Sequence, residues 1–199
     1  MELQKIEIKF FAVEREPVPL AVFIDLFHGW IQASDGVYHD VVDYSHMHQG
    51  PGVVLVAPDF NVSVDETGGR RGFLFSQKTL LEGSNQERLT RVFQNALENC
   101  RHLQTEPALQ GKIEFRFGEF EITLNDRLLA PNGDESYGAL TAEIKPFVNR
   151  IFGGAPASLQ QESDARRRVR LRIQAMAPVD PAAFLSHVGA QADGPARIN

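Results

Sequence analysis

The sequence predicts an α+β domain: a mainly antiparallel sheet of short strands and hairpins, with about three helices covering one face. Several short segments with strand-like patterns are separated by turn residues, which is typical of hairpins. Three longer segments instead repeat their apolar residues at helical spacing. The mixed order of these segments favours α+β over a regular parallel sheet. With 199 residues, 43% of them hydrophobic, the chain is long enough to bury one core.

Composition and charge narrow the class of protein. The formal net charge of −6 supports solubility and disfavours nucleic acid as a partner. The single cysteine, Cys100, cannot form an internal disulfide or a cysteine-based zinc site. The longest apolar run, residues 18–26, is interrupted by Asp25 and is shorter than the roughly 20 residues that span a bilayer. No signal-peptide pattern begins the chain. We therefore expect a soluble, cytoplasmic, reduced protein with no membrane partner.

The first elements are a strand and an unusually apolar helix. Residues 5–10 alternate polar and apolar side chains, which predicts a half-buried strand. Pro17 and Pro19 then introduce a helix that runs to about Gln32, because proline is tolerated in a first helical turn. This helix is apolar almost all round, so we expect it to be largely buried.

A region of short strands follows. Gly50-Pro51-Gly52 is a strong turn signal before the continuous apolar strand 53–56. Residues 61–65 alternate, and residues 72–75 form another apolar run. We expect these last two strands to form a hairpin through residues 66–70.

The clearest helix is predicted over residues 85–104. Ser84 and Glu87 form a capping box, which satisfies free amides of the first turn, and apolar residues then recur at helical spacing. Residues 112–124 are predicted to form a hairpin with a two-residue turn at Gly118-Glu119, which would place six apolar side chains on one face. A short strand at residues 128–129 follows.

The last third is predicted to be more loosely organised. A third helix spans residues 137–151, kinked or split at Pro146 and ended by Gly153-Gly154. We expect one α+β domain over 1–152, a flexible connector over 153–165, a terminal strand over 166–175 that joins the same domain, and a mobile tail over 176–199.

One window points toward metal chemistry. Residues 39–52 hold three of the six histidines of the chain. On a strand, His46 and His48 would point the same way and could bind one divalent metal ion through two imidazoles. A catalytic zinc needs about three protein ligands, so another would have to come from elsewhere, for example from Asp25 or His28. The alternative is that these histidines are simply exposed at a strand end.

A second candidate lies on the first helix. Asp25, His28 and Gln32 form one polar stripe, in which the carboxylate of Asp25 could orient the imidazole of His28 as in half of a general-base pair. The alternative is the solvated face of an amphipathic helix. No nucleophile motif accompanies the pair. We expect Cys100 to be a small core residue.

Arginines supply the remaining candidates. Arg70 and Arg71 follow two glycines in a predicted hairpin loop and could bind an anion. Arg168, Arg170 and Arg172 would form a row on one strand face, suited to an acidic partner or nucleic acid. The alternative is that these arginines pair with glutamates such as Glu114 and Glu121 on a neighbouring strand. The acidic total favours this alternative.

These observations leave function open between classes. The leading hypothesis is a non-catalytic module that binds a small ligand or a protein partner. The rival is a metal-dependent or His/Asp-dependent enzyme, for example a hydrolase, built on His46 and His48 with Asp25 and His28. A weaker alternative is docking of the arginine strand onto an acidic partner. Homodimerisation through a sheet edge or the apolar first helix is a further expectation.

Overall fold

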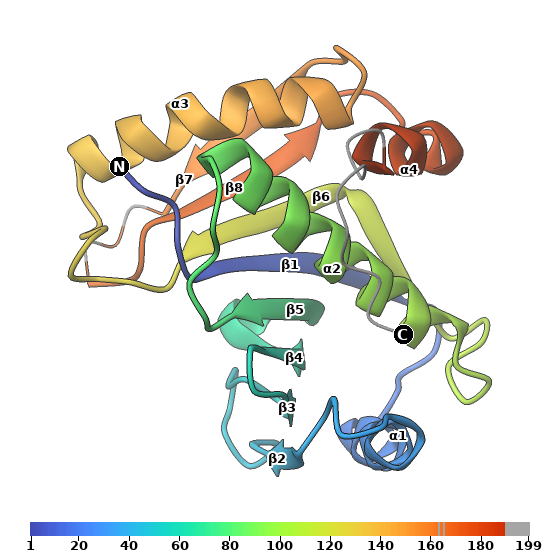
Figure 1. Cartoon of the computed structure of the whole chain (residues 1–199). Helices are drawn as coiled ribbons and strands as arrows, with labels where there is room; N and C mark the ends of the chain where they lie inside the picture. The colour runs from blue at the N-terminus through green and yellow to red at the C-terminus, as the bar shows by residue number, and fades with distance from the viewer. Residues whose placement is uncertain (163, 165, 190–199) are drawn as a thin grey trace.

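An antiparallel sheet of eight strands forms the centre of the molecule (Figure 1). The computed structural model describes residues 1–162, 164 and 166–189. The strand order is β2-β3-β4-β5-β1-β6-β8-β7. The strands are β1 (Ile6–Glu14), β2 (Asp40–Asp43), β3 (Val53–Val56), β4 (Phe60–Asp65), β5 (Gly72–Gln77), β6 (Ile113–Leu124), β7 (Ala157–Gln161) and β8 (Arg170–Ala175). The predicted α+β class is confirmed.

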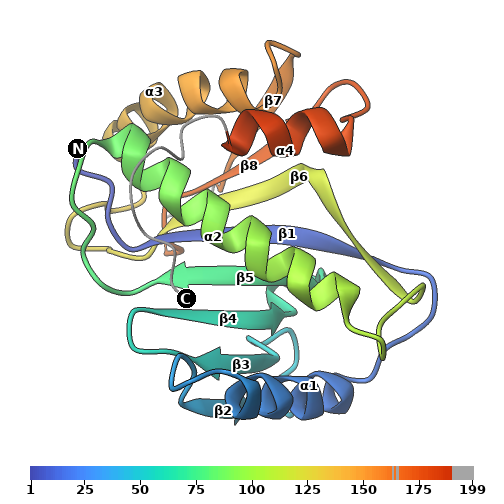
Figure 2. The same cartoon turned by 45° about the vertical axis from the view of Figure 1, so that its right-hand side comes forward.

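Helices cover one face of this sheet. They are α1 (Leu20–Ala33), α2 (Asn85–Thr105), α3 (Asp134–Ile151) and α4 (Pro181–Gly189). Figures 1 and 2 show α2 crossing the middle of the sheet, α3 and α4 on the β6–β8 side, and α1 at the β2 edge. The core lies between the helices and the sheet. There the rings of Phe10 in β1 and Phe93 in α2 pack edge to face, with their centroids 5.4 Å apart. No helix of the described residues covers the opposite face of the sheet.

Helix α2 forms as its sequence predicts. The Ser84 side chain accepts a hydrogen bond from the Glu87 backbone amide, and the Glu87 carboxylate accepts one from the Ser84 backbone amide. The helix begins at Asn85 and buries its apolar side chains against the sheet. Cys100 is part of this core, and burial raises the pKa of its thiol well above the usual value. Its predicted place in the core is confirmed.

The hairpin predicted at Gly118-Glu119 is wrong. Residues 113–124 form the single strand β6, which pairs with β1 on both sides of residues 117–119, and the register shifts there, between Phe10 and Phe11 of β1. This bulge reverses which residues face the helices, so that Phe115 and Phe120 both lie in the core. A chain reversal and a bulge both change which residues face the core, and here the bulge does so within one continuous strand.

The helix predicted after Pro19 is confirmed as α1, but the expectation that it is largely buried is wrong. Only Phe23, Phe27 and Trp30 are buried. The apolar arc is wider than the contact with the sheet, because α1 packs at the sheet edge over β2 and β3 rather than between two layers. Several apolar side chains of α1 are therefore left partly exposed.

Four further differences concern the later part of the chain. The strand predicted at residues 128–129 is a turn, in which Leu128 is 94% exposed. Pro146 does not split α3. Strand β7 lies within the segment predicted as a connector, because it pairs with β8, and α4 lies within the predicted tail. Residues 190–199 of that predicted tail lie outside the described residues.

Candidate functional site

The histidine window lies in turns rather than on a strand. Strand β2 ends at Asp43, and two turns follow, in which Met47 donates its backbone N–H to Tyr44 O and Gly50 donates to Met47 O. His46 and His48 lie in these turns and are exposed. The expectation that strand geometry aligns the two imidazoles is therefore wrong.

Among the residues that the structure describes, no group of three or more histidine, cysteine, aspartate or glutamate side chains is close enough to hold a metal ion. Asp25 and His28 are exposed on α1, on the side away from the buried Phe23 and Phe27. The polar stripe is thus a solvated helix face. The catalytic role assigned to the Asp25–His28 pair stays a prediction.

Arg70 and Arg71 are engaged in ion pairs. The guanidinium of Arg70 donates two hydrogen bonds to the carboxylate of Glu119, at 2.9 and 3.1 Å. Arg71 pairs with Glu66 at 2.8 Å and with Glu14. An anion at either arginine would have to displace a carboxylate that the chain already provides.

The arginines of β8 and the loop before it extend this pairing into a ladder on the helix-free face. Arg168 pairs with Glu7 of β1 at 2.8 Å, and Arg170 pairs with Glu121 of β6 at 3.2 Å. Arg172 donates from Nε to Glu119 at 2.8 Å. Pairing with Glu121 is confirmed, whereas Glu114 pairs with Arg15 instead. We call these cross-strand pairs the charged ladder; its members are Glu7, Arg70, Glu119, Glu121, Arg168, Arg170 and Arg172.

Two carboxylates of the charged ladder are buried enough for their pKa values to be raised. Burial raises the pKa of Glu7, and the charge of Arg168 opposes the shift only in part. Burial likewise raises the pKa of Glu121, against the charge of Arg170. Beside the ladder, Lys9 and Asp65 form a buried ion pair at 2.5 Å. The polar side of β1, predicted to face solvent, is therefore buried because other charged side chains cover it.

A hollow lies between α2 and α4, and we call it the α2–α4 groove. Its volume is about 490 Å³, within the usual range of small-molecule sites. It is lined by Gln94, Leu97, Glu98, Arg101, His102, Thr105, Leu185, Val188 and Gly189. Gln94 of α2 donates a hydrogen bond to Val188 O of α4 at 2.8 Å, which fixes the spacing of the two helices.

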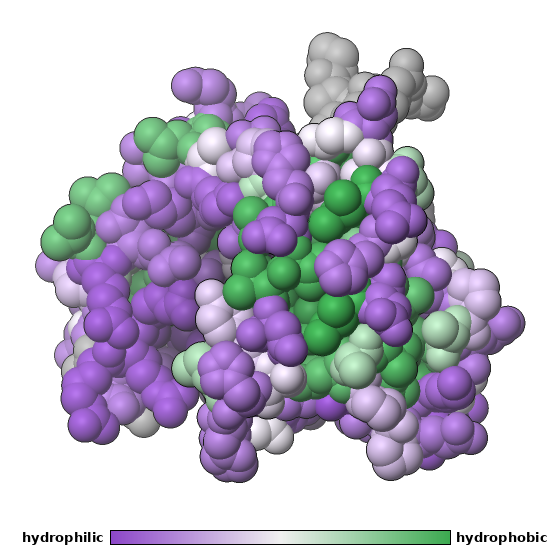
Figure 3. All heavy atoms as spheres, turned by 90° about the horizontal axis from the view of Figure 1, so that it is seen from below, coloured by the Kyte–Doolittle hydropathy of each residue, from purple (hydrophilic) through white to green (hydrophobic). Residues whose placement is uncertain are grey.

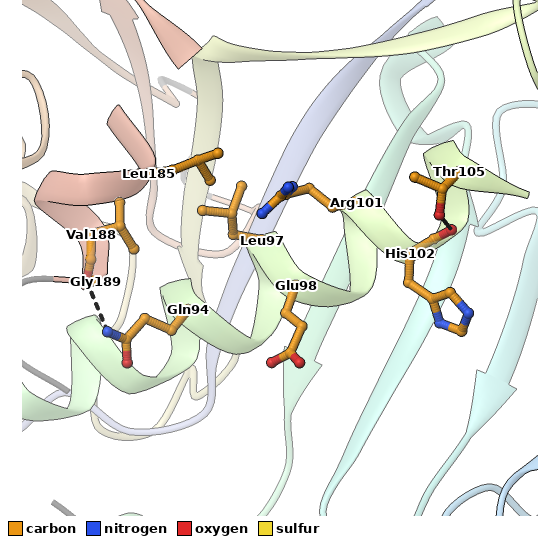
Figure 4. Close-up of a pocket in the computed structure, with 9 residues that line it drawn as sticks. All are labelled: Gln94, Leu97, Glu98, Arg101, His102, Thr105, Leu185, Val188 and Gly189. Atoms are coloured by element: carbon orange, nitrogen blue, oxygen red, sulfur yellow. Dashed lines mark hydrogen bonds between the residues drawn. The ribbon is translucent and has the colours of Figure 1, made fainter. Parts of the chain in front are cut away.

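The groove combines an apolar floor with one cation. Leu97 and Val188 are buried, and Leu185 is half-buried beside them. Figure 4 shows Arg101 extending along α2 toward Leu97 and Leu185. Arg101 has no hydrogen bond or ion pair with any described residue. A cationic group beside an apolar floor can bind a molecule that carries both an anionic and an apolar part.

The other polar residues of the groove face elsewhere. In Figure 4, Glu98 and His102 point away from the apolar side chains. Glu98 instead acts on Tyr38, which does not line the groove: burial, and secondarily the charge of Glu98, raises the pKa of Tyr38 to about 12. The imidazole of His102 stacks on the indole of Trp30 in α1, with the ring centroids 4.2 Å apart. The Thr105 hydroxyl donates a hydrogen bond to His102 O within α2. These groups do not converge as a nucleophile and base would.

A smaller hollow of about 240 Å³ lies near Arg15 and Glu114. Its two charges pair with each other at 3.0 Å. It therefore presents less unsatisfied charge to a ligand than the α2–α4 groove does.

Comparison with protein-family models, curated proteins and solved structures gives no match, so the site is interpreted from its own residues. No helix in the described part of the chain is long and apolar enough to cross a membrane. Sequence reasoning missed the groove because it missed α4. The signals were present: Pro181 suits a first helical turn, and Phe184 and Val188 are four residues apart, on one helix face.

Proposed function

We propose that the chain is a non-catalytic binding module whose α2–α4 groove takes a small ligand with an apolar body and one anionic group. The observation that carries the proposal is Arg101, a guanidinium with no partner among the described residues, held beside Leu97 and Leu185. Every arginine of the charged ladder, by contrast, already contacts a carboxylate. Arg101 is therefore better placed than these arginines to bind an anion from solution.

Binding rather than catalysis is favoured by the groups around the groove. The Thr105 hydroxyl is occupied by its own helix, and His102 lies flat against Trp30. General-base chemistry needs the base within hydrogen-bond reach of the group that it deprotonates. The apolar floor and Arg101 provide affinity and orientation for a ligand without supplying that chemistry.

The test is titration calorimetry with decanoate, and with decanol as the uncharged ligand of the same chain length. We expect decanoate to bind and decanol to bind about tenfold more weakly, because one charge-assisted hydrogen bond contributes roughly 1.4 kcal/mol. Arg101→Gln should remove this difference. Arg91→Gln, an exposed arginine on α2 that does not line the groove, is the matched control.

A second variant tests the location. Leu185→Trp should fill the groove and abolish decanoate binding while the melting temperature stays close to that of the parent. The proposal fails if decanoate does not bind, if decanol binds equally well, or if neither Arg101→Gln nor Leu185→Trp weakens binding.

A further inference from the structure

An apolar surface lies away from the groove, where α1 meets the edge of the sheet. Figure 3 shows a broad apolar patch surrounded by polar residues on the underside of the molecule, where Figure 1 places α1 and β2. We call it the α1–β2 surface. The partly exposed apolar side chains of these two elements are Leu20, Val22, Ile24, Leu26, Ile31, Val41 and Val42. Contiguous exposed apolar patches of this kind mark interaction sites.

The same surface includes an open strand edge. In the described part of the chain, strand β2 ends the sheet and has β3 as its single partner. Tyr44 donates its backbone N–H to Gly52 on the β3 side, so the alternation of an antiparallel ladder turns the backbone groups of Val41 and Asp43 outward. Natural edge strands are commonly protected by charged side chains or proline; β2 has no lysine or proline, and its two aspartates stand at its ends. The Asp40 carboxylate accepts the Val41 N–H at 2.8 Å, which protects one donor.

We propose that a second copy of this chain covers the α1–β2 surface, by antiparallel pairing of β2 with β2 about a two-fold axis at Val41. Two-fold symmetry makes one surface sufficient for both subunits. The pairing satisfies the outward backbone groups and joins the two sheets into one. The Val41 N–H exchanges the Asp40 carboxylate for a backbone carbonyl of the other copy.

The position of the axis follows from charge. The outward residues Val41 and Asp43 can pair in three two-fold registers. An axis at Asp43 opposes this carboxylate to itself, and an axis at Val42 places it opposite Val41. An axis at Val41 instead brings each Asp43 beside His39 of the other copy; because His39 donates its backbone N–H to Val56 O of β3, this contact runs through the side chains. Hydrogen bonds from Ser45 lower the pKa of Asp43, so the carboxylate is charged at neutral pH.

The helices fit the same arrangement. Strands lie about 4.8 Å apart, so the two-fold axis lies about 2.4 Å outside β2. Helix α1 contacts both β2 and β3. With its axis midway between these strands, α1 would lie roughly 5 Å from the two-fold axis. Two copies of α1 would then lie about 10 Å apart on the same face of the joined sheet, close to the usual spacing of packed helices. The partly exposed apolar side chains of α1 would thus be covered by the same helix of the second copy.

Cysteine cross-linking tests the register. With the axis at Val41, two copies of residue 41 face each other at about 5.5 Å between Cα atoms, a distance that a disulfide can bridge. Under a mild oxidant, Val41→Cys should form a covalent dimer, while Val42→Cys should not. The native Cys100 is fully buried and cannot compete. Cross-linking at residue 42 instead of 41 would overturn the proposal.

Sedimentation tests the interface itself. The parent chain should dimerise with rising concentration, and Val41→Pro should reduce the dimer at least tenfold, because proline removes an outward N–H but no β2–β3 hydrogen bond. The matched control is Gln161→Pro, which removes the corresponding outward N–H at the β7 edge. A circular dichroism melt of each variant monitors the fold. A parent that stays monomeric, or a dimer that Val41→Pro leaves unchanged, would refute the proposal.

Discussion

The two halves of the sheet differ in how their helix-free surface is satisfied. On the β1–β6–β8 side, the helix-free face carries the charged ladder, in which arginines and glutamates of neighbouring strands neutralise one another. On the β2 side, the same face carries Val54 and Val56, and the edge strand turns backbone groups outward. The ladder is satisfied within the chain, whereas the β2 edge is not.

This difference shows that charge density alone is a poor guide to a binding surface. The most charged region, with Arg168, Arg170 and Arg172, uses its charge internally. The α2–α4 groove and the α1–β2 surface carry less charge, but each presents groups whose interactions are incomplete within the described chain. A partner gains more free energy from incomplete groups than from groups that it must first separate.

The largest expected effect comes from breaking the buried pair beside the ladder. Lys9 donates to Asp65, to Thr67 O and to Arg70 O, and the side chains of Lys9 and Asp65 are 5% and 4% exposed. Lys9→Met should lower the free energy of unfolding by about 3–5 kcal/mol, because it leaves a buried carboxylate without its cation. Urea denaturation measures the loss. Adding Asp65→Asn should recover part of it, and a loss below about 1 kcal/mol would contradict burial of the pair.

A smaller effect is expected where α1 is attached to the rest of the molecule. Trp30 donates from Nε1 to the Glu106 carboxylate at 2.6 Å and stacks on His102. Trp30→Phe should cost about 1–3 kcal/mol, because it leaves a half-buried carboxylate without that donor. Hydrogen exchange should show the change mainly in α1 and β2. An equal loss of protection across β6 and β8 would mean that the two sides of the sheet open together.

The pH dependence of the ladder has a definite sign. Burial raises the pKa of Glu7 above 4.5, so the folded state binds its proton more tightly than the unfolded state does. The Glu7 contribution to stability is therefore present at low pH and is lost as pH rises through the raised pKa. In Glu7→Gln, stability relative to the parent should increase as pH rises from about 4.5.

Urea denaturation across this pH series measures the slope. Glu87 is a control of opposite sign, because hydrogen bonds from Ser84 lower its pKa and its contribution is lost as pH falls. A flat difference between Glu7→Gln and the parent would mean that Glu7 is not buried as described.

Local patterns predicted the helices better than they predicted contacts between strands. The capping box at Ser84 and Glu87 needs only neighbouring residues, and α2 starts where it indicates. The change of face near Gly118 has two local solutions, a turn or a bulge, and pairing with β1 selects the bulge. Strand β7 lacks a strong pattern of its own because its pairing with β8 defines it.

The candidate sites show the same limit. That the arginine strand would pair with Glu121 could be predicted from charge balance, but the partners Glu7 and Glu119 depend on strand register. The groove needs the packing of α4 on α2, two segments far apart in the sequence, and no local pattern reports that contact. The placement of His46 and His48 in turns depends on where the β2–β3 pairing ends, at Asp43, and the pattern within residues 39–52 does not indicate that end.

The smallest expected effect distinguishes the ladder from an ordinary surface pair. Arg15 and Glu114 form a cross-strand pair like those of the ladder, but their side chains are 68% and 55% exposed. Arg15→Met should change the free energy of unfolding by less than about 0.5 kcal/mol, because solvent screens the pair. Arg172→Met should cost about 1–2 kcal/mol, since Arg172 contacts both the buried Glu119 and the ring of Phe11. Equal effects of the two substitutions in urea denaturation would mean that the ladder contributes no more than surface charge, and the helix-free face would then be as open to charged partners as any other surface.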